Sequence, residues 1–121
     1  RSGQGAIVNL ASIAGLRPAA QVVPYAASKA AVVNMTVSLA RVLAPEVRVN
    51  AVAPGWMEGR WMQGALGDQY ERLMERRAQR TPLGRVATPD DVAQTIVSLI
   101  TENDFVTGQT IVIDGGYSIV A

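Results

Sequence analysis

The sequence contains no cysteine and no histidine, and its one lysine stands at position 29. These absences exclude a Ser-His-Asp triad, a thiol nucleophile, a disulfide and a zinc site built on His or Cys ligands. Tyrosine, lysine and carboxylate side chains are therefore the remaining candidates for proton transfer. The lack of cysteine also fits a reducing compartment, so we expect a cytoplasmic protein.

Charge and chain length further limit the partners and the domain organisation that this protein can have. The net charge is +1, which gives no electrostatic argument for a nucleic-acid partner. The sequence shows neither a signal peptide nor a membrane-spanning segment, and no membrane partner is expected. Its 121 residues provide about one domain or part of a larger one. The chain begins with RSGQG, which is typical of a linker that leads into a strand, so we expect further residues upstream.

Short apolar segments with turn residues behind them predict the strands. They lie at residues 6–11, 47–53 and 109–114, and the first of them is a nearly continuous apolar run. Runs of this kind are typical of strands that are buried in a parallel sheet.

Helical segments alternate with these strands. A helix is expected at residues 25–43, and another at residues 89–100, where Thr88 is the N-cap and Pro89 the first helical residue. The Arg-rich residues 56–80 predict a short exposed helix. Strands and helices in alternation predict an α/β fold with right-handed crossovers, as part of a doubly wound parallel sheet.

Tyr25 and Lys29 are the most informative pair of residues. They lie four apart in a predicted helix, so they share one face, a turn from each other. A fixed ammonium lowers the pKa of a neighbouring phenol, which makes a tyrosine usable as a general acid or base. Because the helix around Lys29 is nearly free of charge, we expect a partner to bind this ammonium. Ser12 stands thirteen residues before Tyr25, at the end of the first predicted strand.

Each of these features also has a simpler explanation. A Tyr-x-x-x-Lys pair is frequent by chance, Ser12 can be an ordinary turn residue, and so can Asp114 before two glycines. Trp56 and Trp61 either line a substrate pocket or cover the core. The GQG stretch at residues 3–5 suggests a phosphate loop, but it precedes a strand and lacks a third glycine, so we reject it.

Taken together, the motifs resemble those of the short-chain dehydrogenase/reductase family, and its 3-oxoacyl-acyl carrier protein reductases in particular. The resemblance covers essentially the whole chain, with the Ser–Tyr spacing that this family uses. GAIVNLASIAG at residues 5–15 is similar to the family's fifth strand and catalytic serine, and YAASKAA at residues 25–31 to its active-site helix. VRVNAVAPG at residues 47–55 resembles the sixth strand, and PLGR, PDDVA, TGQ and DGG match the C-terminal part.

This resemblance implies reversible hydride transfer between NAD or NADP and a small carbonyl or alcohol substrate. Tyr25 would be the general acid or base, Lys29 would assist it and bind the nicotinamide ribose, and Ser12 would hydrogen-bond the substrate oxygen. No metal is implied. The cofactor-lining residues implied in this way are Tyr25, Lys29, Pro54, Gly55 and Met57, the last through its backbone.

The resemblance also indicates which part of the family's domain is present. Residues 1–121 match the C-terminal part of a single Rossmann-like domain, in which residues 56–80 would form a lid over the substrate. In this family the glycine-rich phosphate turn and the strand that selects NAD or NADP precede the matched part, and this sequence does not contain them. The fragment is therefore expected to be inactive alone. Gly59 stands where the family has a threonine that contacts the nicotinamide.

Two other functions and the assembly stay open at this point. One alternative is a structural or binding half-domain without catalysis. The other is a Ser–Lys hydrolase with Ser12 as nucleophile and Lys29 as base, which leaves Tyr25 unexplained. The helix at residues 25–43 is apolar on more faces than one sheet can cover, so we expect it to pack against a second subunit in the complete protein, and the resemblance implies a homodimer or homotetramer. The face predicted to meet a second subunit carries Ala27, Ala31, Asn34 and Ser38.

Overall fold

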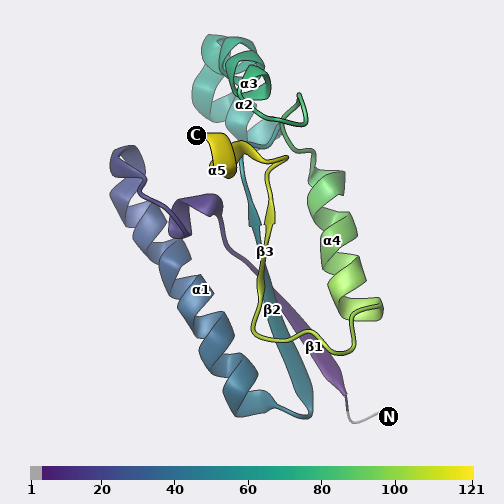
Figure 1. Ribbon diagram of the computed structural model, residues 1–121. Helices are drawn as coiled ribbons and strands as arrows, with labels where there is room; N and C mark the ends of the chain where they lie inside the picture. The colour runs from purple at the N-terminus through teal and green to yellow at the C-terminus, as the bar shows by residue number, and fades with distance from the viewer. Residues whose placement is uncertain (1–3) are drawn as a thin grey trace.

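The computed structural model describes residues 4–121, so the first glycine of the GQG stretch lies outside the described residues (Figure 1). Within that range, three parallel strands form one sheet in the order β1-β2-β3. The predicted strands and the α/β class are confirmed, with bounds that differ by one residue at most at either end. The strands are β1 (Gly5–Leu10), β2 (Val47–Pro54) and β3 (Thr110–Ile113).

The long helices begin and end close to the predicted residues. They are α1 (Val23–Leu43) and α4 (Pro89–Thr101). α4 starts with a capping box, in which the Thr88 hydroxyl accepts the Asp91 backbone N–H and the Asp91 carboxylate accepts the Thr88 N–H. This pairing satisfies two backbone donors that a helix start leaves open.

The shorter helices depart further from the prediction. Where one short helix was expected within residues 56–80, the chain forms α2 (Arg60–Leu66), the 3-10 turn η3 (Gly67–Gln69) and α3 (Tyr70–Gln79). The expected loop at residues 13–23 contains the 3-10 turns η1 (Ile13–Gly15) and η2 (Ala20–Val22). A last helix, α5 (Tyr117–Val120), was not predicted.

The sheet lies between α1 on one face and α4 on the other (Figure 1). Along β2, Ala51 and Ala53 pack with residues of α1, whereas Val52 between them packs with Val92 and Leu99 of α4. The strands follow one another across the sheet in the order β1, β2, β3, whereas α1 and α4, which lie in the two connections, cover opposite faces. The β1–β2 and β2–β3 crossovers therefore have opposite hands. The prediction of right-handed crossovers is therefore wrong for one of them.

The core is centred on β2, whose residues 49–54 are all buried. In α1, only Thr36 and Ala40 are fully buried among the described residues, so this chain by itself covers one face of the helix. α2, α3 and α5 gather at the end of the sheet to which β2 and β3 lead (Figure 1). That end is where ligands of parallel α/β sheets bind.

Candidate active site

Ser12 lies two residues after the carboxyl end of β1 and forms the N-cap of η1. Its backbone is extended, and its hydroxyl oxygen accepts a hydrogen bond from the backbone N–H of Ala14 at 3.1 Å. A serine hydroxyl has one proton and two lone pairs. Since the backbone donor occupies a lone pair, the Ser12 hydroxyl is oriented and its own proton can be offered to another group.

Tyr25 and Lys29 lie on the first turns of α1. The Lys29 ammonium is 5.6 Å from the centroid of the Tyr25 ring, as the spacing predicts, and the Tyr25 side chain is 49% exposed. Lys29 Nζ donates to the backbone carbonyl of Leu10 at 3.1 Å. This carbonyl is the partner that the apolar setting of Lys29 predicted, and it ties α1 to the end of β1, two residues before Ser12.

Gly15 brings the Ser12 segment into direct contact with α1. A Cβ atom at Gly15 would lie 2.7 Å from the Ala30 backbone nitrogen and 2.7 Å from the Lys29 carbonyl carbon. Only a residue without a side chain allows η1 to approach the helix backbone this closely. The spacing between Ser12 and the Tyr25–Lys29 pair therefore depends on this glycine, which the sequence presented as an ordinary turn residue.

The Pro54–Gly55 turn lies at the end of β2, between the ends of the neighbouring strands. A Cβ at Gly55 would lie 2.7 Å from the Asp114 Cβ and 3.5 Å from the Ile13 Cδ1. The next residues pair with the start of α4, through Ala87 N–H to the Trp56 carbonyl and Glu58 N–H to the Ala87 carbonyl, both at 2.9 Å. This pairing uses none of the backbone groups of Met57, whose side chain packs into the core beside α4.

The expected lid contains Gly59 and both tryptophans. The Gly59 N–H donates to the hydroxyl of buried Tyr70 at 3.1 Å, so α3 holds the residue that stands at the family's threonine position. The Arg77 guanidinium lies over the Trp56 ring, 4.6 Å from its centroid, whereas the Trp61 side chain is 79% exposed. Trp56 thus packs against Arg77 of α3, whereas the side chain of Trp61 on α2 is exposed.

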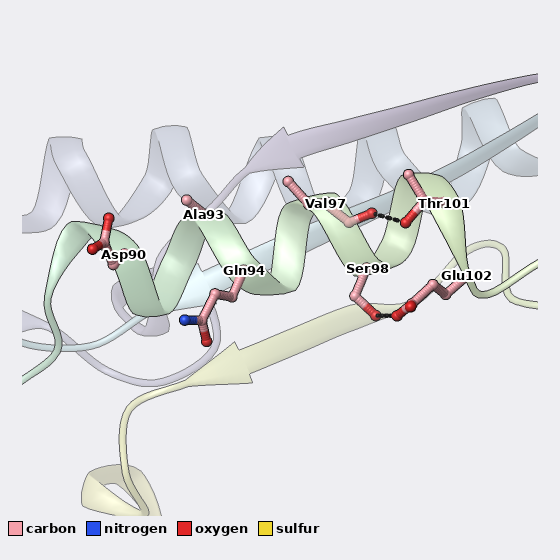
Figure 2. Close-up of a pocket in the computed structure, with 7 residues that line it drawn as sticks. All are labelled: Asp90, Ala93, Gln94, Val97, Ser98, Thr101 and Glu102. Atoms are coloured by element: carbon pink, nitrogen blue, oxygen red, sulfur yellow. Dashed lines mark hydrogen bonds between the residues drawn. The ribbon is translucent and has the colours of Figure 1, made fainter.

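Hollows on the part of the chain that the structure describes include the following two. One, of about 350 Å³, is lined by α4 residues and by Glu102 just after the helix, and Figure 2 shows the hydrogen bonds from Ser98 to Glu102 and from Thr101 to the Val97 carbonyl. The other, of about 430 Å³, is lined by residues of the η1 segment, β3 and α5, namely Ile13, Leu16, Arg17, Pro18, Val112, Ser118 and Ala121. Only the second hollow borders the Ser12 segment. Within residues 4–121, no cluster of acidic side chains could hold a metal ion, and no helix is long and apolar enough to cross a membrane.

Comparison with known proteins identifies related sequences along the whole chain. A family model described as Enoyl-(Acyl carrier protein) reductase matches residues 1–118. The chain is 47% identical over 119 residues to the short-chain dehydrogenase/reductase homolog YusR of Bacillus subtilis, covering 98% of this chain and 88% of YusR. It is 44% identical over 114 residues to the 3-oxoacyl-[acyl-carrier-protein] reductase FabG of Thermotoga maritima, covering 93% of this chain but only 45% of FabG.

Solved structures show the same fold. A gluconate 5-dehydrogenase from Burkholderia cenocepacia, in complex with NADP and tartrate, superposes with a TM-score of 0.87 at 31% identity, over 98% of this chain and 47% of that one. The aldohexose dehydrogenase of Thermoplasma acidophilum gives a TM-score of 0.91 at 29% identity, over 98% and 49%. The chain thus spans about half the length of these structures.

Proposed function

The chain belongs to the short-chain dehydrogenase/reductase family, and we propose that it is the C-terminal half of an NAD- or NADP-dependent oxidoreductase that interconverts a carbonyl and an alcohol. One observation carries the proposal. The Lys29 ammonium lies beside the Tyr25 ring and is bound to the carbonyl of Leu10, just before Ser12. These contacts support the proposal, because they put the Lys29 ammonium beside the Tyr25 phenol and attach it to the chain two residues before Ser12, at the carboxyl end of β1.

In carbonyl reduction, Tyr25 would donate its phenolic proton to the substrate oxygen, and in oxidation it would take that proton back. Ser12 would donate its hydroxyl proton to the same oxygen and stabilise the negative charge that develops there. The Ala14 N–H supports this role, because it fixes the Ser12 oxygen from the other side. Lys29 would keep its positive charge beside Tyr25 and offer donors to a ribose, since an ammonium has three and Leu10 takes one.

The residues present fit a nicotinamide cofactor, which supplies or accepts the hydride when it is bound. Gly55 packs closely against Asp114 and Ile13, so the Pro54–Gly55 turn is supported by its neighbours at the carboxyl end of the sheet. The backbone groups of Met57 lie outside the pairing of its neighbours with Ala87, which leaves them suited to contact a ligand. Tyr25, Lys29 and these residues would hold the nicotinamide riboside.

Replacement of Tyr25 tests this assignment in a complete protein that contains this chain. Tyr25→Phe keeps the ring and removes the transferable proton, so kcat should fall roughly a hundredfold to ten-thousandfold while dinucleotide affinity is retained. Tyr117→Phe, the same chemical change in α5, is the matched control and should leave kcat near the wild-type value. Circular dichroism shows whether each variant folds. Near-normal turnover of folded Tyr25→Phe would refute the role.

A half-domain without catalysis is the second candidate, favoured by the outer edge of β1, which pairs with no strand in the part of the chain that the structure describes. A complete protein that reduces no carbonyl in a panel of ketones and aldehydes would support it. The Ser–Lys hydrolase is disfavoured by geometry. Ser12 is hydrogen-bonded to Ala14 and Lys29 to Leu10, and no hydrogen bond joins Ser12 to Lys29 in residues 4–121.

A further inference from the structure

Asp114 follows β3 at the point where the ends of all three strands meet. Its Cα and Cβ lie against the main chain of Gly55, where an added Cβ would be 3.4 Å and 2.7 Å away, respectively. The Gly55 N–H donates to the carbonyl of Ile113, the residue before Asp114, at 3.1 Å. The end of β3 therefore supports the Pro54–Gly55 turn directly.

The carboxylate of Asp114 fixes the turn that follows. Its Oδ1 accepts the Gly116 N–H at 2.9 Å, and its Oδ2 accepts the Ser118 N–H at 2.9 Å. Burial raises the pKa of Asp114, but hydrogen bonds from Ser118 and Gly116 and the charge of Arg17 outweigh it, so the pKa lies below its ordinary value. The carboxylate is thus ionised at neutral pH, and hydrogen bonds to an ionised acceptor are the stronger kind.

The other side of this turn contacts residues 81–83, which directly follow the expected lid. Gly115 and Gly116 have positive φ angles of 62° and 92°, which glycine adopts without strain. A Cβ at Gly115 would lie 2.8 Å from the Thr81 Cγ2, and one at Gly116 would lie 2.9 Å from the Pro82 Cγ. Leu83 N–H also donates to the Gly115 carbonyl at 3.1 Å. Residues 81–83, just after α3, are therefore attached to the Asp-Gly-Gly turn.

We propose that Asp114 is a positioning residue for the proposed reaction, because it sets the turn that supports Pro54–Gly55 on one side and residues 81–83 on the other. This inference rests on the proposed function. Two adjacent glycines with positive φ have wide conformational freedom, and the Asp114 carboxylate restricts it through two hydrogen bonds, beside the backbone bond from Leu83 to Gly115. Without it, the cofactor-lining turn and the end of the lid lose their common support.

The test uses a complete protein that contains this chain and three variants. Asp114→Ala removes both acceptors, and Asp114→Asn keeps the side-chain shape with one carbonyl acceptor in place of two. Asp104→Ala, in the exposed loop that precedes β3, is the matched control. The first two readouts are KM for NADH and NADPH and KM for the carbonyl substrate. The third is the primary isotope effect on kcat, measured with deuterium in place of the hydrogen that the reduced dinucleotide transfers.

We expect Asp114→Ala to raise the dinucleotide KM about tenfold, equivalent to about 1.4 kcal/mol of binding. The isotope effect on kcat should rise as well, because a loosened nicotinamide surface slows hydride transfer itself. Asp114→Asn should recover part of both changes, and Asp104→Ala should match the wild type. A residue that serves folding alone would lower the melting temperature and leave KM and the isotope effect unchanged.

Failure of the inference is distinct from failure of the proposed function. If the wild type turns over and folded Asp114 variants keep the wild-type dinucleotide KM and isotope effect, the positioning role is refuted while the function stands. If the wild type transfers no hydride, the proposed function is refuted. The Kd values of the wild type and the Asp114 variants for NADH and NADPH, measured by calorimetry, then decide whether Asp114 has the positioning role. Where Asp114→Ala does not fold, Asp114→Asn carries the same comparison, and unchanged affinity refutes the role.

Discussion

Gly15→Ala should separate the Ser12 segment from α1 by adding one methyl group. The new Cβ would lie 2.7 Å from the Ala30 nitrogen and the Lys29 carbonyl carbon and 2.9 Å from the Lys29 oxygen. All three are backbone atoms inside a long helix, so they cannot rotate away. Gly15 is not among the described glycines with positive φ, so alanine brings no backbone strain of its own there and the effect is purely steric.

The size of the effect follows from these distances. Ordinary contact begins at 3.4 Å, so η1 has to move away from α1 by roughly 0.7 Å. Overpacking of this kind costs about 1–3 kcal/mol of the free energy of unfolding. The shift also moves Ser12 relative to Tyr25, and a misplacement near 1 Å can reduce catalysis by about a hundredfold. We therefore expect kcat to fall between tenfold and a hundredfold, in line with that estimate.

For a complete protein that contains this chain, thermal unfolding checks the predicted loss of stability, and steady-state kinetics checks the predicted fall in kcat. Gly5→Ala is the control, because an added Cβ at the start of β1 meets only the Val47 side chain, at 3.7 Å and 3.9 Å, which is ordinary contact. That variant should not lose stability, since alanine is favoured over glycine in a strand, and it should keep its kcat. If Gly15→Ala has wild-type stability and wild-type kcat, the contact between η1 and α1 does not set the geometry of the site, and the reasoning fails.

Three further predictions concern the helix cap, the assembly and the isolated chain. Arg85 and Thr88 hydrogen-bond Asp91 and hold its pKa below the ordinary 3.8, so Asp91→Asn should lower the melting temperature at pH 7. The difference from the wild type should shrink as the pH falls below 3.8, because Asp91 is then protonated in the unfolded chain before it is protonated in the folded one, and a constant difference would contradict the linkage. The exposed outer face of α1, near Ala27 and Ala31, should meet a second subunit, so light scattering of the complete protein at micromolar concentration should show a dimer or tetramer and not a monomer. Residues 1–121 alone should be poorly soluble because the β1 edge is open, and titration calorimetry should detect no NAD or NADP binding below millimolar levels; a micromolar isotherm would contradict this.

The sequence predicted those elements that local patterns define. Apolar runs gave the three strands, and Thr88 with Pro89 marked the start of α4, because caps and periodicity involve neighbours in the chain. The pairing of Tyr25 with Lys29 was equally local, since helix geometry places such residues together. The division of residues 56–80 into two helices was missed, and the glycine at Gly67, where α2 ends with φ of 56°, was the available signal.

Contacts between distant segments were not predictable in the same way. The sequence around Gly15 and around Gly55 suggested only that each glycine belongs to a turn. In the structure, Gly15 allows a close approach to the backbone of Lys29, and Gly55 allows a close approach to Asp114. Nothing within five residues of either glycine indicates which segment it meets. The position of Ser12 relative to Lys29 therefore depends on information that only the assembled sheet and helices supply.

The polar residues of β2 also have a structural role that the sequence analysis did not assign, on the face of the strand that lies toward α4. Arg48 and Asn50 face the same side as Val52, toward α4. Arg48 caps the last turn of α4 through the Leu99 carbonyl at 2.8 Å and the Ile100 carbonyl at 3.1 Å. Asn50, 1% exposed, donates to the Val106 carbonyl at 2.9 Å and accepts the Gln109 N–H at 3.0 Å.

These bonds satisfy the backbone of the connection that returns from α4 to β3, which buried loops otherwise leave unpaired. A fully buried asparagine in a central strand needs such partners, since an unpaired amide there is costly. An Arg and an Asn two apart in an apolar strand were thus a readable signal that a loop, and not only a helix, crosses that face. Asn50→Leu should therefore destabilise the β2–β3 connection more than the sheet itself. Hydrogen exchange can check this, because faster exchange should be confined to the backbone amides of residues 106–110.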